Sequence, residues 1–309
     1  MSGNSREGMR IGIDLGGSKY RLGLVSLNSE LIGDSIRVSV DEINDADDLI
    51  DSIAISVNDL MSSQQVAREE IIGVGMGCPG PIDIKSGVIL HTLNMTYLRD
   101  FPLLKRMKEK LSMEVVLGND ANCFVLGQQI AGAAKGCINV FGITLGTGFG
   151  CGMIIDGRLY EGATGTAAEY GISHYLEGEF EDYVSGRGLK SIYKKISGNS
   201  KRPFEIEETA RGGAPEAMQA FAEFGRHIGN ALSHVVNLID PEMIVIGGSI
   251  ANSYDLFIEP LKKSLLSGVS ELPAQNLKIR KAENGELNTI IGAAKLFDSR
   301  TNFNPPNSR

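Results

Sequence analysis

A pattern of apolar strand, glycine-rich turn and second apolar strand occurs twice in this chain, and it constrains the fold more than any other feature. Residues 9–17 (MRIGIDLGG) lead into residues 20–27 (YRLGLVSL). The second occurrence begins at Asn139 and continues as VFGITLGTGFGCGMIIDGRL. Short apolar runs that flank glycine turns are typical of β-hairpins. We therefore predict one hairpin at the start of the chain and another near its middle.

The length and the order of the predicted elements indicate an α/β protein with two lobes. A chain of 309 residues exceeds the usual size of one domain, which favours two lobes with a ligand cleft between them. Strand followed by helix recurs along the sequence, as in α/β folds. We predict a disordered N-terminal tail at 1–8, an N-terminal α/β lobe at 9–138, a C-terminal α/β lobe at 139–298 and a polar tail at 299–309.

Within these lobes, the spacing of apolar residues separates strands from helices. It predicts strands at 71–77, 114–117 and 243–250, and helices at 47–61, 103–111, 121–134 and 216–238. A segment rich in Ser, Lys, Glu and Gly, 197–215, is predicted to include a surface loop, and a last helix to start near Thr289.

Charge and cysteine content exclude several classes of function. The net charge of −8 disfavours binding to nucleic acid or an anionic membrane, so a nucleotide would have to be held by backbone N–H groups and a metal ion. The sequence contains no apolar run long enough to span a bilayer, and the first ten residues lack the apolar core of a signal peptide, so we expect a cytoplasmic protein. The four cysteines lack metal-ligand spacing and are predicted to be buried free thiols: Cys78, Cys123, Cys137 and Cys151.

Two glycine turns are candidate phosphate sites. In the first, Asp14-Leu15-Gly16-Gly17-Ser18-Lys19, the glycines would let the backbone approach phosphate oxygens, and Asp14 could hold a hydrated Mg²⁺; an ordinary hairpin turn is the alternative. In the second, GITLGTGFGCG at 142–152, five glycines would suit a hairpin around a phosphate chain. This second motif matches neither the P-loop nor the dinucleotide-binding fingerprint.

Two further motifs carry carboxylates. Gly118-Asn119-Asp120-Ala121-Asn122 lies between a strand and a helix, where Asp120 could accept a hydroxyl proton during phosphoryl transfer, or where Asn119 or Asp120 could simply cap the helix. The stretch EGATGTAAEYGISHY, followed by FEDYVSG, contains Glu169, His174 and Glu181. Together these side chains could bind several sugar hydroxyls, whereas singly they would more often be surface or capping groups.

Taken in order, these motifs resemble the ROK family of sugar kinases and related repressors. The resemblance covers about residues 9–297 and rests on DLGGS, GCPGPID, GNDAN, LGTGFG and NLIDPEMIVIGG. It implies a two-lobed actin-like ATPase (ribonuclease H-like) fold that binds ATP with Mg²⁺, and a homodimer. For ATP it implies Asp14, Gly16, Gly17, Ser18, Lys19, Gly146, Thr147, Gly148, Gly247 and Gly248, with Asp14 also near the metal. For the sugar it implies Gly80, Asn94, Asn119, Asp120, Glu169, His174 and Glu181, with Asp120 as catalytic base.

The sequence departs from the family in one region. Many members have E-x-G-H followed by a cysteine-rich zinc motif, but here Ile172 follows Glu169-Tyr170-Gly171 and the cysteines are missing, so we expect no structural zinc. Glu181 resembles the glutamate that closes that motif, and we expect His174 to replace its histidine after a two-residue shift.

Three functions are compatible with the resemblance: a hexose kinase, a sugar-responsive repressor and a silent sugar-binding protein. Only about eight residues precede the first strand, too few for a helix-turn-helix module, and Asp14, Asp120 and Thr147 are all present, so we favour the kinase. The sequence does not choose among glucose, fructose, allose, mannose and N-acetylmannosamine; glucose is the first expectation.

Overall fold

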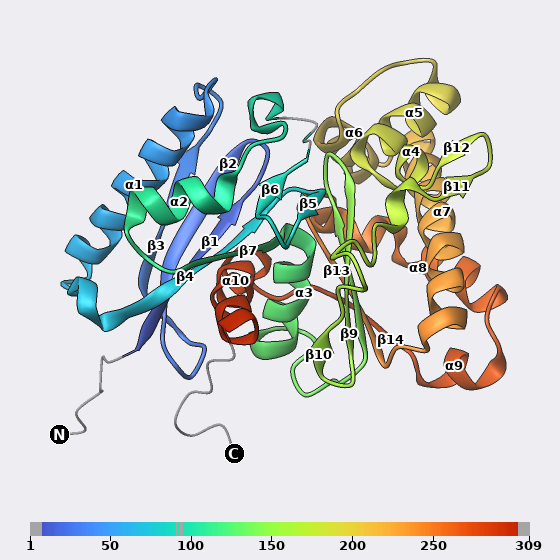
Figure 1. Ribbon diagram of the computed structural model, residues 1–309. Coiled ribbons are helices and arrows are strands. Elements are labelled where there is room, and N and C mark those ends of the chain that lie inside the picture. Colours follow the sequence, from blue (N-terminus) through green and yellow to red (C-terminus); the bar gives the residue numbers. More distant parts are fainter. Residues whose placement is uncertain (1–7, 91, 93–94, 302–309) are drawn as a thin grey trace. The chain divides into compact units, whose positions relative to one another are not determined.

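The computed structural model describes residues 8–90, 92 and 95–301, and its contacts divide the chain into two compact units (Figure 1). Unit 1 consists of Met1–Gly136, Glu161–Ala167 and Glu283–Arg309, and unit 2 of Cys137–Tyr160 and Ala168–Ala282. The predicted boundary after residue 138 lies close to this division. The predicted C-terminal lobe at 139–298 differs from unit 2, because the chain from Glu283 onward groups with unit 1.

Unit 1 is built on a five-stranded sheet in the order β3-β2-β1-β4-β7. Its strands are β1 (Met9–Leu15), β2 (Lys19–Val25), β3 (Leu31–Ser39), β4 (Ile71–Cys78) and β7 (Val115–Asn119). The first three strands pair antiparallel, which confirms the predicted N-terminal hairpin, and β1, β4 and β7 pair in parallel. Parallel pairing brings the carboxyl ends of β1, β4 and β7 to one edge of the sheet.

Four helices accompany this sheet: α1 (Ala46–Ser63), α2 (Leu103–Leu111), α3 (Asp120–Ala131) and α10 (Gly285–Thr301). Ile11 and Ile13 of β1 share a buried core with apolar residues of α1 and α2. Gly12, between them, points to the other face because side chains alternate along a strand. A Cβ on Gly12 would lie 2.0 Å from the backbone oxygen of Ile290 in α10, so α10 packs directly on the opposite face.

Close backbone approach explains several glycines around α10. An added Cβ on Gly75 of β4 would lie 1.8 Å from the Ala293 oxygen, and one on Gly127 of α3 would lie 1.8 Å from the Asn288 oxygen. Any side chain at these positions would force α10 away. The helix begins at Gly285 rather than near Thr289, and it runs to Thr301, so the first part of the predicted polar tail is helical. The rest of that tail and residues 1–7 lie outside the described residues.

Unit 2 repeats the strand order of unit 1 in its own five-stranded sheet, β10-β9-β8-β13-β14. The strands are β8 (Val140–Leu145), β9 (Phe149–Ile155), β10 (Arg158–Leu159), β13 (Met243–Gly247) and β14 (Lys278–Lys281). β8, β9 and β10 pair antiparallel, and β8, β13 and β14 pair in parallel. The second predicted hairpin is therefore confirmed, and both hairpins start sheets of the same design.

The helices of unit 2 are α4 (Glu181–Val184), α5 (Gly186–Ser197), α6 (Pro203–Arg211), α7 (Pro215–Ile239), α8 (Tyr254–Ser267) and α9 (Glu271–Asn276). The long helix α7 packs against α8 at Gly225 and Gly229, where an added Cβ would lie 2.4 Å from backbone oxygens of α8. Phe221, Phe224 and Phe257 are fully buried in this core.

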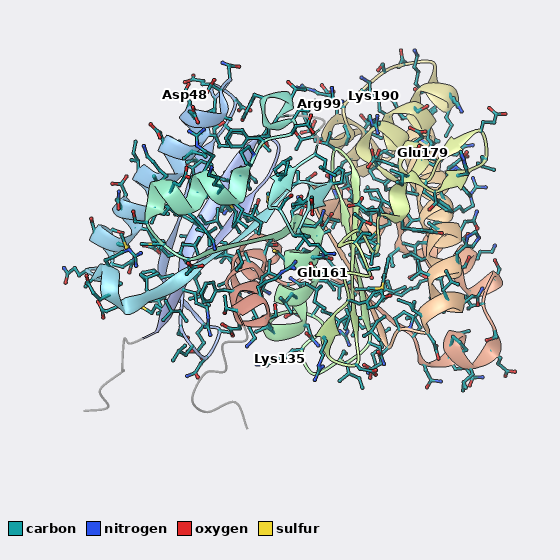
Figure 2. All side chains as sticks on the ribbon, in the orientation of Figure 1. Asp48, Arg99, Lys135, Glu161, Glu179 and Lys190 are labelled. Atoms are coloured by element: carbon teal, nitrogen blue, oxygen red, sulfur yellow. The ribbon has the colours of Figure 1, made fainter. Side chains whose placement is uncertain are left out.

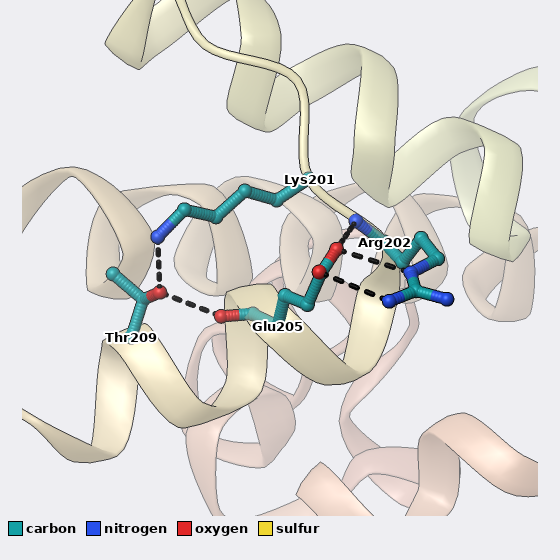
Figure 3. A network of polar contacts seen from close by, with 4 residues as sticks. All are labelled: Lys201, Arg202, Glu205 and Thr209. Atoms are coloured by element: carbon teal, nitrogen blue, oxygen red, sulfur yellow. Dashed lines mark hydrogen bonds and ion pairs between the residues drawn. The ribbon is translucent and has the colours of Figure 1, made fainter.

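The segment 197–215 includes a surface loop at 198–202, as predicted, but nine of its residues form α6, a helix that the sequence analysis did not predict. Figure 3 shows the contacts that begin and brace this helix: Glu205 accepts a hydrogen bond from the backbone N–H of Arg202 at 2.7 Å, and Thr209 lies 2.7 Å from the ammonium of Lys201. Proline at the first helical position also favours the helix, because it has no N–H to leave unpaired.

Among the described residues, no helix is long and apolar enough to cross a membrane.

Candidate active site

In unit 1, the parallel register brings two aspartates to the same edge of the sheet. Asp14 is opposite Gly77 of β4, and Gly77 is opposite Gly118 of β7, so Asn119 and Asp120 follow directly at that edge. Gly77 leaves room for α3 at this edge, because an added Cβ would lie 2.9 Å from Sγ of Cys123 in that helix. The two predicted carboxylates therefore belong to one site, although more than a hundred residues separate them in the sequence.

Asn119 caps α3, the helix that carries Asp120. Its side-chain oxygen accepts from the backbone N–H groups of Ala121 at 2.9 Å and Asn122 at 3.4 Å. An oxygen of Asp120 also accepts from the Ala121 N–H, at 2.8 Å. The capping alternative is thus realised by Asn119, and it places Asp120 in the rigid first turn of the helix. A role of Asn119 in sugar binding stays a prediction.

The surroundings of Asp14 disfavour its charged form. Burial, the negative charge of Asp120 and that of Glu286 raise the pKa of Asp14 to about 7, while Lys19 and Arg21 act in the opposite direction. Two carboxylates held this close repel each other, and a cation between or beside them would remove that cost. Unit 1 therefore offers one carboxylate suited to a metal ion and a second suited to accept a proton.

The turn that follows Asp14 is closed by a hydrogen bond from the Gly16 N–H to the Lys19 oxygen at 2.9 Å. Gly17 and Ser18 are exposed at its tip, as a phosphate-binding turn requires. The ammonium of Lys19, predicted to contact ATP, forms an ion pair with Glu286 of α10 at 2.5 Å, and Arg21 pairs with the same carboxylate. A phosphate would have to compete with Glu286 for Lys19.

The remaining predicted residues of unit 1 lie in the loop after β4. Gly80 precedes a cis peptide bond to Pro81, and the chain continues into the small hairpin of β5 (Ile82–Asp83) and β6 (Val88–Ile89). Asn94 lies outside the described residues.

In unit 2, the predicted phosphate hairpin is a tight turn between β8 and β9. The Gly146 N–H donates to the Gly148 oxygen at 3.1 Å, and the Gly146 oxygen accepts from the Gly186 N–H at 2.8 Å. Glu181 accepts from the Phe149 N–H at 2.9 Å. A Cβ on Gly148 would lie 2.8 Å from that carboxylate, so any side chain at this position would displace it. Glu181, predicted to bind sugar, is thus also a support for the hairpin.

A cavity of about 460 Å³ adjoins this hairpin, within the range of small-ligand pockets. Gly146 and Thr147 form part of its wall, as do two cations of α5: Arg187, which pairs with Glu181 at 2.5 Å, and Lys190. Lys190 is labelled in Figure 2. The other lining residues are Gly186, Pro203, Phe204, Glu207, Ser249, Ile250, Asn252 and Ser253. A glycine hairpin beside a cationic cavity is suited to a nucleotide.

Sequence reasoning missed most of this cavity. Of the predicted pair, Gly247 ends β13 and Gly248 follows it, with an added Cβ on Gly248 only 2.3 Å from the Leu145 oxygen. The cavity is lined by the residues that come next, from Ser249 onward. One signal was available. Ser185 caps α5, and the segment after it contains two glycines and two cations (GRGLK) at a helix start, where anions bind readily.

The other predicted sugar residues of unit 2 lie in the segment before α4. Glu169 is exposed at the start of the 3₁₀ helix η3 (Tyr170–Ile172), and His174 is exposed on β11 (His174–Tyr175), which pairs with β12 (Gly178–Glu179). Cys78, Cys123 and Cys151 are buried free thiols as predicted, whereas Cys137 is only partly buried. Within the described ranges, no cluster of three or more His, Cys, Asp or Glu side chains could hold a metal ion.

Comparisons with known proteins agree with this geometry. The sequence profile of the ROK family matches residues 10–300. A glucokinase from Halalkalibacterium halodurans is 27% identical over 94% of this chain and 96% of its own length, and an N-acetyl-D-glucosamine kinase from Pectobacterium atrosepticum is 30% identical over 93% and 98%. The crystal structure of a ROK family glucokinase from Streptomyces griseus, in complex with glucose and AMPPNP, superposes with a TM-score of 0.80 at 28% identity, covering 94% of this chain and 99% of that one.

The two sheets share one strand order, and the fold is that of the actin-like ATPases. Together, the fold and these relatives define the class as ATP-dependent sugar kinases. Because the family profile covers nearly the whole sequence, the chain belongs to the ROK family.

Proposed function

We propose that this protein transfers the γ-phosphoryl group of ATP to a hydroxyl of a free hexose, with Asp120 as general base. The observation that carries the proposal is the convergence of Asp14 and Asp120 at the carboxyl edge of the unit 1 sheet. Phosphoryl transfer to an alcohol requires a carboxylate near the attacking hydroxyl and a second one near the metal. Relatives named glucokinase and N-acetyl-D-glucosamine kinase support a hexose acceptor.

In the proposed reaction, Asp120 accepts the proton of the sugar hydroxyl while that oxygen attacks the γ-phosphorus. The bond between the γ-phosphorus and its bridging oxygen breaks, and ADP leaves with the electron pair. The helix start at Asn119 holds Asp120 in place, which keeps its carboxylate oriented before the substrate arrives. In unit 2, the turn at Gly146–Gly148 and the adjoining cavity would bind the nucleotide.

The surroundings of Asp14 fit a divalent cation, because Asp120 and Glu286 already disfavour an unpaired negative charge there. When bound with ATP, Mg²⁺ would neutralise charge on the phosphates. Asp14 would hold it, directly or through water, and the exposed turn at Gly17 and Ser18 would face the phosphate oxygens.

A coupled assay with Mg-ATP and a panel of sugars tests the proposal. The panel contains glucose, N-acetylglucosamine, fructose, allose, mannose and N-acetylmannosamine, and glucose is the acceptor we expect to be used best. ADP release that depends on one of these sugars is the expected result. No sugar-dependent ADP release with any of them would reject the proposed reaction.

The role of Asp120 is tested with Asp120→Asn, which keeps the shape of the side chain and removes the base. We expect kcat to fall at least about a hundredfold, because a general base contributes roughly 10² to 10⁴ in rate. Sugar binding, measured by calorimetry, should remain. The matched control is Asp34→Asn, which removes an exposed carboxylate of the same unit and should leave kcat unchanged. Near-normal turnover of Asp120→Asn would remove this residue from the mechanism.

A further inference from the structure

The segment from Glu169 to Glu181 carries three of the predicted sugar-binding side chains, yet it has little regular structure of its own. It contains one turn of 3₁₀ helix, η3, and a hairpin whose strands β11 and β12 are two residues each. An isolated hairpin is marginal in water even at greater length. Contacts with other elements must therefore determine where Glu169 and His174 lie.

One face of α7 provides these contacts. Residues 227, 230, 231 and 234 are spaced so that they share a face of the helix. The Tyr170 hydroxyl donates to the Ala231 oxygen at 3.0 Å. The Tyr175 hydroxyl lies 3.0 Å from Nδ1 of His227 and 3.0 Å from the amide nitrogen of Asn230. The segment is thus fastened to α7 by two tyrosines, one in η3 and one in β11.

The donors and acceptors around Tyr175 are fully matched. The side-chain nitrogen of Asn230 can only donate, so the Tyr175 oxygen accepts from it and the Tyr175 hydroxyl proton is donated to Nδ1 of His227. His227 then carries its proton on Nε2, on the side where Glu223 lies 3.7 Å away, and burial lowers the pKa of His227, which favours this neutral form. The oxygen of Asn230 accepts from Ser264 of α8 at 2.7 Å, which orients the amide.

Ring packing supports the same attachment. Tyr175 stacks on Phe180 with ring centres 4.3 Å apart, and Phe180 is only 2% exposed in the core of unit 2. Tyr183 meets the Tyr175 ring edge-on at 5.2 Å. These rings hold Tyr175 at the correct depth, and its hydroxyl determines where the hairpin lies along α7.

We propose that Tyr170 and Tyr175, bound to His227, Asn230 and Ala231, form a tyrosine clasp that positions Glu169 and His174 for sugar binding. The clasp rests on the proposed function, since it acts on side chains assigned to the sugar. Glu181 has its own anchors, the Phe149 N–H and Arg187. Loosening the clasp should therefore change the sugar end of the segment and leave the phosphate hairpin in place.

The test is Tyr175→Phe, which keeps the ring stack and removes the two hydrogen bonds. We expect KM for the preferred sugar to rise about fivefold, the effect of losing one or two neutral hydrogen bonds, while KM for ATP stays within about twofold. The matched control is Tyr254→Phe, which removes a hydroxyl bonded to the Ile279 oxygen elsewhere in unit 2 and should leave the sugar KM unchanged. An unchanged sugar KM in Tyr175→Phe, or an equal rise for ATP, would overturn the clasp.

A double-mutant cycle identifies the contact itself. Asn230→Ala should raise the sugar KM, and adding it to Tyr175→Phe should cause little further change, because both remove the same bond. Fully additive effects would contradict the proposal.

Hydrogen–deuterium exchange separates failure of the clasp from failure of the proposed function. The Phe180 N–H donates to the Ser173 oxygen across the hairpin, so peptides covering 173–181 should exchange faster in Tyr175→Phe than in the wild type and the Tyr254→Phe control. This readout needs no substrate. Unchanged exchange would reject the clasp even if a hexose is phosphorylated. Faster exchange in a protein that phosphorylates no sugar would support the clasp and reject its proposed role in sugar binding.

Discussion

Replacing Asp14 by Asn should stabilise the protein, and the gain should grow with pH. Burial and the charges of Asp120 and Glu286 raise the pKa of Asp14 from 3.8 to about 7. The folded state therefore holds this proton more tightly than the unfolded state does. Stability associated with Asp14 is fully present below pH 3.8 and is lost as the pH rises through 7. Asparagine cannot ionise, so Asp14→Asn does not lose this stability as the pH rises.

The size of the effect follows from the two pKa values. A difference of one in pKa corresponds to about 1.4 kcal/mol, so the raised pKa of Asp14 costs the folded state roughly 4 kcal/mol above pH 7, where the buried group is ionised. At pH 5 the cost is about 1.5 kcal/mol, because Asp14 must then take up a proton on folding. Both figures are upper values, because Asp14 is partly exposed and solvent offsets some of the cost. The stability gained in Asp14→Asn should therefore be about 2 kcal/mol larger at pH 8 than at pH 5.

Urea unfolding of both proteins at pH 5 and pH 8, without divalent cations, measures this difference directly. Asp34→Asn is the matched control, because it removes an exposed carboxylate from the same unit and should give no pH-dependent gain. Added Mg²⁺ should stabilise the wild type at pH 8 more than the variant. An equal gain at both pH values would refute the claim that Asp14 is held in an unfavourable charge environment.

Two glycine substitutions test the packing around the sites. In Gly148→Ala the new Cβ would lie 2.8 Å from Glu181 and disturb its bond to the Phe149 N–H, so KM for ATP should rise about tenfold; an unchanged value would show that this bond does not shape the phosphate hairpin. Gly75→Ala would place a Cβ 1.8 Å from the Ala293 oxygen and should lower the free energy of unfolding by at least about 3 kcal/mol in urea titrations. Gly212→Ala, whose Cβ has room, is the control and should change it by less than about 1 kcal/mol. Similar losses in both variants would count against direct packing of α10 on the sheet.

Local sequence patterns were sufficient for most elements. Both hairpins, the helix at Leu103–Leu111 and the strand that starts at Ile71 lie where apolar spacing predicts them, because each buries one face or one short run. Apolar spacing did not predict α6, because polar residues predominate in that helix. The sequence nevertheless contains signals for the start of α6: Pro203 stands at the first helical position, and Glu205 accepts a hydrogen bond from the Arg202 N–H.

The candidate site was predictable in its motifs and less so in its contacts. Asp14 and Asp120 were identified from glycine turns and a strand–helix junction, but their proximity depends on parallel pairing of β1, β4 and β7. The sequence predicted that Lys19 contacts ATP and that Glu181 binds sugar. In the folded protein both side chains also have protein partners: Lys19 pairs with Glu286, and Glu181 accepts from the Phe149 N–H. The cations Arg187 and Lys190 escaped notice because their helix start matches no common motif.

The sequence by itself determined the ROK family membership, the two hairpins and the order of the phosphate and carboxylate motifs, since all of these are written in short contiguous segments. Only the tertiary structure decided that the C-terminal helix α10 returns to the first sheet, and that Tyr170 and Tyr175 fasten a short segment to α7. The physical reason is the same in both cases. Close backbone approach and matched hydrogen bonds join residues far apart in the chain, and no local periodicity indicates which distant partner a glycine or a tyrosine will meet.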